Sequence, residues 1–189
     1  MEAYDEHEII QGCLKGESFF QEKLYKMHYN TLLKICARYV TNMIDAETLL
    51  NDSFLKIFTN LKSFQNKGSF EGWMKRITVN TCLDFLRTKE FNYSRKLVEM
   101  KDSNAGTSVH LEEGIIQQLE FKALVKLIQE LPGTMKVVFN LYIFEDYSHK
   151  EIGEELGITE NTSQWYLHQA RKALKEKIKI NTNKLAHIQ

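Results

Sequence analysis

Six side chains that can bind bases or phosphates recur near the carboxyl end of the chain. They are Asn161, Gln164, Trp165, His168, Arg171 and Lys172. At about 100° per residue of an α-helix, these positions fall on one face or on its flanks. Amide and imidazole groups can hydrogen-bond to base edges, and cations bind phosphate oxygens. The spacing therefore predicts a helix whose outer face could contact a nucleic acid.

The preceding residues predict the element that would position this face. Ser148 and Glu151 have the spacing of a capping box, and Gly157 would end the helix that they begin. Thr159 can cap a second helix. Its inner face would carry Ser163, Leu167, Ala170 and Leu174. A short helix, a glycine turn and a second helix form the helix-turn-helix pattern, in which the second helix enters the major groove of DNA.

An ordinary helical hairpin with a solvated outer face would show the same periodicity, so the pattern alone leaves both interpretations open. A run of cations follows along the second helix. It comprises Arg171, Lys172, Lys175, Lys177 and Lys179. Because phosphate contacts supply most of the non-specific affinity for nucleic acids, this run favours nucleic-acid binding.

The composition favours a helical protein without a catalytic or metal site. The 189 residues include one Pro and nine Gly, too few for the turns of an all-β fold. The cysteines Cys13, Cys36 and Cys82 lie far apart in apolar segments, which predicts reduced core thiols. The six histidines are scattered without ligand spacing, and no phosphate loop or nucleophile motif occurs. We therefore expect no enzymatic activity, no cofactor and no metal.

Charge and hydropathy bound the partners and the compartment. The 25 basic residues balance 25 acidic ones, whereas a protein that binds DNA alone is usually more basic. The acidic surface therefore suggests a protein partner. No apolar run approaches membrane-spanning length, and the amino terminus lacks a signal-peptide pattern. We expect a cytoplasmic protein without membrane insertion.

The first half of the chain predicts a set of helices. Apolar spacing indicates helices over about 9–14, 17–40 and 45–61, the last one capped by Asp45. The core stripe of the third helix would be Leu50, Phe54, Ile57, Phe58 and Leu61. Its outer face would present Thr48, Asp52, Leu55, Lys56 and Thr59. The outward Leu55 is only weak evidence for a docking surface, since single exposed apolar side chains are normal.

A loop at 62–69 and a largely apolar helix at about 70–90 follow. One narrow polar stripe on that helix comprises Arg76, Asn80, Asp84 and Arg87, with Trp73 at its amino-terminal end. Asp84 is expected to pair with neighbours one turn away, and Trp73 to fill the core. For Arg76 and Asn80, two alternatives stay open: a structural ladder, or contacts with bases beside the aromatic-flanked loop.

From about 88 to 113 the periodicity fades, which predicts a flexible linker. A second set of helices follows, over about 116–131 and 134–144, with Pro132 and Gly133 between them. The core residues of the first would be Leu119, Leu124, Leu127, Ile128 and Leu131. The expected fold is all-α, with two small helical domains joined by a flexible linker and a helix-turn-helix in the C-terminal domain.

Three separated segments together resemble the extracytoplasmic-function group of the sigma-70 family of RNA polymerase sigma factors. The segment by which that family docks on core RNA polymerase is similar to DAETLLNDSFLKIFTNL, and its minus-ten-reading helix is similar to SFEGWMKRITVNTCLDFLR. Its minus-thirty-five domain is similar to LIQELPGTMKVVFNLYIFEDYSHKEIGEELGITENTSQWYLHQARKAL. The resemblance implies region 2 at 8–92, a linker at 93–113 and region 4 at 114–178.

The resemblance also implies a function and a set of partners. The chain would be an alternative sigma factor that takes core RNA polymerase to promoter DNA and helps to melt it by capturing a flipped base. An anti-sigma factor is a frequent partner within the family. Docking on the polymerase would use Asp45, Asn51, Asp52, Leu55 and Lys56. The minus-ten element would be read by Phe64, Gln65, Asn66, Lys67, Arg76, Asn80 and Arg87. The minus-thirty-five element would be read by Ser148, Lys150, Asn161, Thr162, Gln164, Trp165, His168, Arg171 and Lys172.

Some residues depart from the family pattern, and two other classes of protein remain open. Ser163 stands where the family commonly has Val, and the outer face of the last helix holds fewer cations, which predicts fewer phosphate contacts. A helix-turn-helix regulator with an all-helical sensing or dimerisation domain would instead bind palindromic sites as a dimer. A helical adaptor that binds only protein is the third class. The polar stripe beside an aromatic loop, within 45–87, favours the sigma factor.

Overall fold

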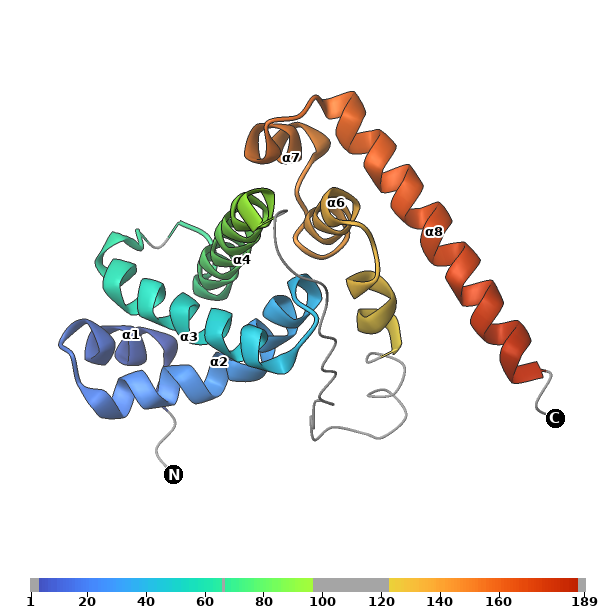
Figure 1. Ribbon diagram of the computed structural model, residues 1–189. Coiled ribbons are helices and arrows are strands. Elements are labelled where there is room, and N and C mark those ends of the chain that lie inside the picture. The colour runs from blue at the N-terminus through green and yellow to red at the C-terminus, as the bar shows by residue number, and fades with distance from the viewer. Residues whose placement is uncertain (1–3, 66, 97–122, 187–189) are drawn as a thin grey trace. The chain divides into compact units, whose positions relative to one another are not determined.

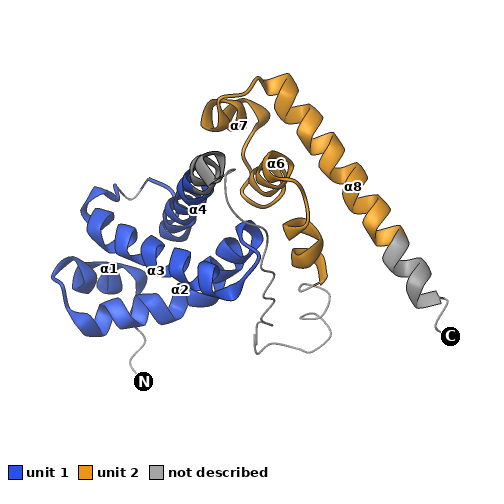
Figure 2. Ribbon diagram, viewed as in Figure 1, with its two compact units in different colours: residues 1–108 blue, residues 109–189 orange. Residues whose placement is uncertain are grey.

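The computed structural model describes residues 4–65, 67–96 and 123–186, and every regular element within these ranges is a helix. The chain divides into two compact units, residues 1–108 and 109–189 (Figures 1 and 2). This architecture confirms the predicted all-α fold with two helical domains. Asn66 and most of the predicted linker, as well as the first residues of the predicted region 4, lie outside the described residues.

The first unit is built from α1 (Glu6–Leu14), α2 (Ser18–Tyr39), α3 (Met43–Asn60) and α4 (Phe70–Lys96), with the short 3-10 helix η1 (Leu61–Ser63) after α3. Helices α2, α3 and α4 pack against one another in pairs, and α1 packs on α2 (Figure 1). The buried side chains recur at helical spacing: Leu24, Leu32, Leu33, Leu50, Phe54, Ile57, Met74, Val79 and Cys82. One apolar core therefore holds these helices together.

The N-cap of helix α3 lies three residues earlier than the sequence predicts. Its N-cap is Asn42, whose side-chain oxygen accepts the backbone N–H of Asp45 at 2.7 Å. The Asn42 amide also donates to the Asp45 carboxylate at 3.1 Å. The predicted cap at Asp45 is therefore wrong, because Asn and Asp are equally good caps and the sequence offers both within one turn. Asp45 lies in the first turn instead, where the helix dipole favours a negative charge.

Helix α4 is longer than predicted. It continues to Lys96, beyond the expected end near residue 90 and into residues 93–96 of the predicted linker. No Pro or Gly interrupts the chain from 73 to 96, so nothing in the sequence stops the propagation of backbone hydrogen bonds. The loss of apolar periodicity after residue 88 therefore does not mark the end of the helix.

The second unit is built from helical residues 123–129, α6 (Gly133–Phe144), α7 (His149–Leu156) and α8 (Glu160–Ala186). Helix α8 packs on both α6 and α7. The core comprises Val125, Ile128, Leu131, Val138, Leu141, Ile152, Leu167, Ala170 and Leu174. Leu124, which we expected to face the core, is exposed, because the buried stripe of its helix runs through Val125 and Ile128. Leu119 lies outside the described residues.

The ends of α7 and α8 have the predicted chemistry. The Glu151 N–H donates to Ser148 Oγ at 3.2 Å, and the Ser148 N–H donates to Glu151 Oε2 at 2.8 Å, which completes the capping box. Thr159 Oγ1 accepts the N–H of Thr162 at 3.1 Å. Gly157 closes α7 with φ +66°, a conformation that glycine adopts at little cost. The predicted inner face of α8 is buried throughout: Ser163, Leu167, Ala170 and Leu174. The helix-turn-helix is therefore confirmed.

Gly153 allows the backbone of the turn to approach α7. A Cβ atom at this position would lie 2.7 Å from the carbonyl oxygen of Ile158. The Gly153 carbonyl oxygen accepts the N–H groups of both Gly157 and Ile158. The hydrogen bonds that close the turn thus bring the two backbone segments too close together for a side chain.

We predict that Gly153→Ala destabilises the C-terminal unit by about 1–3 kcal/mol, because the added methyl group must displace backbone atoms. Urea unfolding followed by circular dichroism measures this change. Gly157→Asn is the matched control, since a Cβ there meets no atom within 4 Å and Asn tolerates the left-handed conformation. Equal stability of Gly153→Ala and the wild-type chain would contradict this role of Gly153.

Candidate functional site

The outer face of α3 carries large apolar side chains among polar ones. Leu55 is 67% exposed, and Asn51 and Asp52 beside it are exposed as well. Ile44, three turns before Leu55 on the same side of the helix, is 73% exposed. Sequence reasoning missed Ile44 because it placed residues 41–44 in a break before the helix. Two apolar side chains thus stand on a face that the core does not use.

Two polar residues of this face form hydrogen bonds with side chains on neighbouring helices. The Tyr25 hydroxyl on α2 donates to Asn51 Oδ1 at 3.1 Å. Lys56 Nζ donates to Asp84 Oδ2 on α4, also at 3.1 Å. Their partners lie 26 and 28 residues away along the chain, so helical spacing within one segment contains no signal for either contact.

Asp84 pairs with two cations. Besides its contact with Lys56, its other carboxylate oxygen lies 3.5 Å from Arg87 Nη1. The expected pair with Arg87, one turn along α4, is confirmed, and the pair with Lys56 was not anticipated. All three side chains are about half exposed, and ion pairs of this kind contribute about 0–1 kcal/mol each. Asp84 therefore joins a predicted docking residue to a predicted DNA-contacting residue with little gain in stability.

Three aromatic side chains anchor the loop before α4. The Phe64 ring centroid lies 5.1 Å from that of Phe70 and 5.4 Å from that of Trp73, and Phe70 and Trp73 are 5.7 Å apart. Phe70 is buried, whereas Phe64 and Trp73 are half-buried. Trp73 thus lies at the edge of the core rather than filling its interior. Such aromatic pairs contribute about 0.5–1.5 kcal/mol beyond the area that they bury, so the cluster holds one end of the loop firmly.

The loop meets the polar stripe of α4 at the amino end of that stripe. Phe64 contacts Trp73, which precedes Arg76 by three residues and so lies beside it on the helix. The predicted minus-ten residues that are exposed are Gln65, Lys67, Arg76, Asn80 and Arg87. The loop therefore contacts α4 through the aromatic cluster, at the end of the helix where the polar stripe begins.

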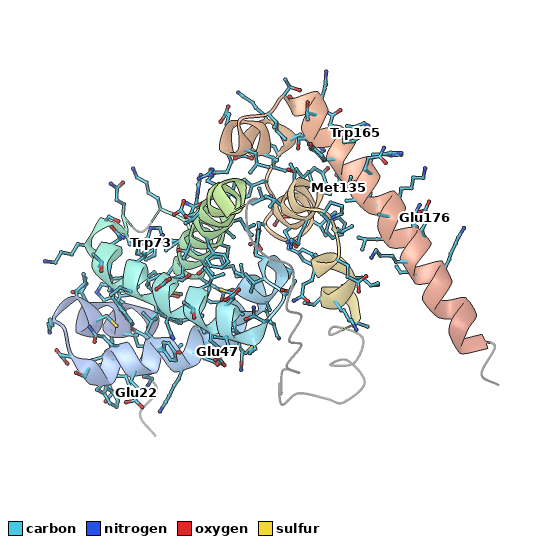
Figure 3. The ribbon with its side chains drawn as sticks, viewed as in Figure 1. Glu22, Glu47, Trp73, Met135, Trp165 and Glu176 are labelled. Carbon is cyan, nitrogen blue, oxygen red and sulfur yellow. The ribbon has the colours of Figure 1, made fainter. Side chains whose placement is uncertain are left out.

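Most of the predicted minus-thirty-five residues are exposed on α7 and on the outer side of α8, where Trp165 is labelled in Figure 3. The exposed members are Ser148, Lys150, Asn161, Gln164, Trp165, His168, Arg171 and Lys172. The Trp165 ring packs edge-on against the Tyr166 ring, with ring centroids 5.0 Å apart. Trp165 nevertheless remains 53% exposed. This is a large, flat apolar surface on a face that is otherwise polar.

Two predicted DNA-contacting residues take part in capping hydrogen bonds: Ser148 is the N-cap of α7, and Thr162 is bonded by Thr159, the residue before α8. The Ser148 hydroxyl lies 2.6 Å from Glu151 Oε2, to which it donates. The Thr162 hydroxyl shares a 2.7 Å hydrogen bond with the hydroxyl of Thr159. Both hydroxyl groups are thus engaged within the helix-turn-helix, which orders the amino ends of α7 and α8.

One cation of the predicted phosphate-binding run has a structural partner. Lys177 Nζ lies 2.5 Å from Glu130 Oε2. This pair joins α8 to the end of the helix at 123–129. The sequence suggested that Lys177 adds to the positive run, whereas here its charge is matched by a carboxylate. Lys172 and Lys175 remain exposed on α8.

The cysteines are confirmed as free, buried thiols: Cys13, Cys36 and Cys82. Burial raises the pKa of Cys13 to about 11, so this thiol stays protonated at neutral pH and is a poor nucleophile. Among the described side chains, no three His, Cys, Asp or Glu residues group closely enough to hold a metal ion. No helix in the same part of the chain is both long and apolar enough to cross a membrane.

Comparison with known proteins relates both units to transcription. Residues 24–91 match Sigma-70 region 2, and residues 121–174 match Sigma-70, region 4. The extracytoplasmic-function (ECF) sigma factor SigW of Bacillus subtilis is 23% identical, over 90% of this chain and 95% of its own length. ECF sigma factor SigE of Mycolicibacterium smegmatis is 26% identical over 87% of this chain, which spans 64% of that relative. The fold is similar to that of sigma factor RpoE, solved in complex with the anti-sigma factor NepR from Bartonella quintana, with a TM-score of 0.57 and 16% sequence identity. The match covers 84% of this chain and 96% of that chain.

We predict that Asp84→Asn lowers the free energy of unfolding by at most about 2 kcal/mol at low salt, because each of its two exposed ion pairs contributes about 0–1 kcal/mol. The difference should vanish near about 1 M salt, where the Debye length falls to roughly 3 Å. Urea unfolding at two salt concentrations measures both effects, with Asp52→Asn on the outer face of α3 as the control. A large loss of stability that does not depend on salt would contradict this account of Asp84.

Proposed function

Because the chain belongs to the sigma-70 family, in its extracytoplasmic-function group, we propose how the surfaces described above direct RNA polymerase to promoters. The protein is an alternative sigma factor, a transcription initiation factor rather than an enzyme, and its partners are core RNA polymerase and promoter DNA. The match of residues 24–91 to region 2 decides against a helix-turn-helix regulator with a sensing domain. The observation that carries the proposal is that each unit presents an exposed polar helix face opposite a buried one.

The first proposed step is docking on core polymerase by the outer face of α3. The residues assigned to it are Asp45, Asn51, Asp52, Leu55 and Lys56, with Ile44 adjoining. Protein interfaces depend on a few apolar anchors surrounded by polar groups. Full burial of one Leu or Ile side chain contributes about 1.5–3 kcal/mol. Leu55 would be the main anchor, and the carboxylates around it would select a basic partner surface.

The second proposed step is capture of a base from the melted minus-ten element. The surface assigned to it comprises Phe64, Gln65, Asn66, Lys67, Arg76, Asn80 and Arg87. Flipping a base costs a few kcal/mol, and stacking on an aromatic ring returns about 1–3 kcal/mol per base. The aromatic cluster of Phe64, Phe70 and Trp73 supports this role, because it holds the loop beside the hydrogen-bonding groups of α4.

The third proposed step is reading of the minus-thirty-five element by the outer face of α8, with Lys150 on α7 contacting phosphate. Ser148 and Thr162 would act there through the capped amino ends of α7 and α8, to whose hydrogen bonds they contribute, since helix amino termini attract phosphate. The net charge of the chain is zero, so we infer weak binding of the free protein to duplex DNA. Docking on polymerase would supply the affinity that the chain itself lacks.

The proposed regions are 8–92 and 114–178, and the continuation of α4 to Lys96 suggests that the linker begins near residue 97. Polymerase and promoters are found in the cytoplasm of bacteria, where we place this chain. An anti-sigma factor remains among the proposed partners. RpoE, which has a similar fold, was solved together with one.

Run-off transcription with core polymerase tests the function and the docking face together. The wild-type chain should give promoter-dependent transcripts from a promoter library. Asp52→Arg with Leu55→Asp should abolish both transcription and core binding while the chain stays folded, because the anchor becomes charged and a carboxylate becomes a cation. Met27→Asp, at a side chain 55% exposed on α2, is the matched control and should keep both activities.

The two possible failures can be told apart. No transcript from the wild-type chain, with a control sigma factor active on the same core, would sink the sigma function. Normal core binding by the double variant would show only that the docking face lies elsewhere.

We further predict that Trp165→Ala changes the preferred sequence of the upstream element and leaves core binding intact. Trp165 offers the largest apolar contact on the outer face of α8, and apolar side chains recognise the thymine methyl group in the major groove. Sequencing of promoters selected from a randomised library by the two holoenzymes compares their preferences. An identical preference for both would contradict the role of Trp165.

A further inference from the structure

Ser163 interrupts the apolar inner face of α8, and its hydroxyl has a specific partner. The side chain is fully buried, and its Oγ lies 2.9 Å from Nδ1 of His149 on α7. Either tautomer of His149 satisfies the contact, because the hydroxyl can donate to a bare Nδ1 or accept from a protonated one. Since a buried hydroxyl without a partner destabilises a fold, the two residues depend on each other.

The His149 ring has a second contact, on its flat side. It stacks on Tyr142 of α6, with centroids 4.4 Å apart and the planes inclined by 21°. Tyr142 in turn lies beneath Arg171, whose guanidinium carbon is 5.8 Å from the ring centroid. This distance is within the range of a cation–π contact.

The four side chains form a row that begins and ends on α8. It runs from Ser163 through His149 and Tyr142 to Arg171, and it passes through α7 and α6 on the way. Ser163 belongs to the buried inner face, whereas Arg171 is exposed at the flank of the outer face. The row therefore connects the packing of the helix-turn-helix to one of the cations that we assign to DNA.

We propose that His149 is a positioning residue for promoter recognition. Held by Ser163 and stacked on Tyr142, it fixes the ring on which Arg171 rests, so that the guanidinium group is presented to a phosphate of the minus-thirty-five element. The inference rests on the proposed function, in which the outer face of α8 contacts DNA. An ordered arginine matters here because the face carries few cations, so each phosphate contact supplies a larger share of the affinity.

A purely structural role would have a different consequence. If the hydrogen bond only held α7 to α8, loss of His149 would lower stability and DNA affinity by the same amount whether or not Arg171 is present. In the proposed role, the two residues act on the same phosphate contact. Their effects on DNA binding would then be coupled, and a double-mutant cycle measures that coupling.

The experiment uses holoenzyme assembled from the full chain and core polymerase. The probe is a promoter fragment that the wild-type holoenzyme selects from a library, and its affinity is measured over a range of salt concentrations. Arg171→Ala should reduce the slope of log affinity against log salt by about 0.9, the value for one phosphate contact on duplex DNA. His149→Ala should reduce the slope in the same direction and weaken binding about two- to fivefold, as expected for an exposed cation–π contact.

Three further variants decide the outcome. His149→Ala with Arg171→Ala should be no worse than Arg171→Ala alone. His149→Phe with Ser163→Ala keeps an aromatic ring on Tyr142 and removes both polar groups, and it should restore the wild-type slope. Phe144→Leu, on the same helix as Tyr142 but in contact with Phe139, is the matched control. It should lower stability and leave the slope unchanged.

Each contrary result has a separate meaning. An unchanged slope in His149→Ala, or additive losses in the double variant, would overturn the positioning role, as would failure of the ring-retaining variant to restore the slope. If Arg171→Ala itself bound the promoter normally, the proposed DNA contact at Arg171 would fail and the inference with it.

Discussion

Burial of one apolar stripe per helix is the interaction on which both units depend. On α3, Leu50 and Ile57 are fully buried, whereas Leu55 lies between them in sequence and is largely exposed. On α8, Leu167 and Ala170 are buried, and Trp165 is not. Neighbouring residues of a helix point about 100° apart, so a helix that buries one stripe must expose the opposite one. Burial of each large apolar side chain contributes about 1.5–3 kcal/mol to the stability of the fold. Because the buried stripe supplies this stability, the residues on the opposite face are available for binding.

Polar contacts between helices specify how the helices are arranged but contribute little to the free energy of folding. Tyr25 on α2 forms a hydrogen bond with Asn51 on α3, and Lys56 on α3 forms one with Asp84 on α4. Both bonds join helices that already pack through their apolar side chains. Lys177 does the same for α8 through Glu130. Exposed contacts of this kind contribute little free energy, but they require particular atoms to face each other and so select one arrangement among those that the apolar stripes allow. Several of the proposed binding residues are thereby held in place before any partner arrives.

The two units divide the proposed work according to what each surface offers. The first unit joins apolar anchors on α3 to an aromatic loop and a polar stripe on α4, which suits contact with a protein and with an unstacked base. The second unit offers hydrogen-bonding groups and a few cations on a helix-turn-helix, which suits duplex DNA. Zero net charge is consistent with this division, because a chain that reaches DNA as part of a holoenzyme does not need to bind it strongly alone.

The sequence by itself determined the helices, their inward and outward faces, and the turn chemistry of the helix-turn-helix. The capping box at Ser148, the left-handed Gly157 and the buried row from Ser163 to Leu174 all follow from residues within a few turns of each other. Only the tertiary structure decided which side chains meet: Lys56 with Asp84, Ser163 with His149, and Tyr142 with Arg171. It also decided that α3 starts after Asn42 and that α4 reaches Lys96. Periodicity is a property of one segment, whereas contacts between helices and the choice among equivalent caps depend on how separate segments pack in space.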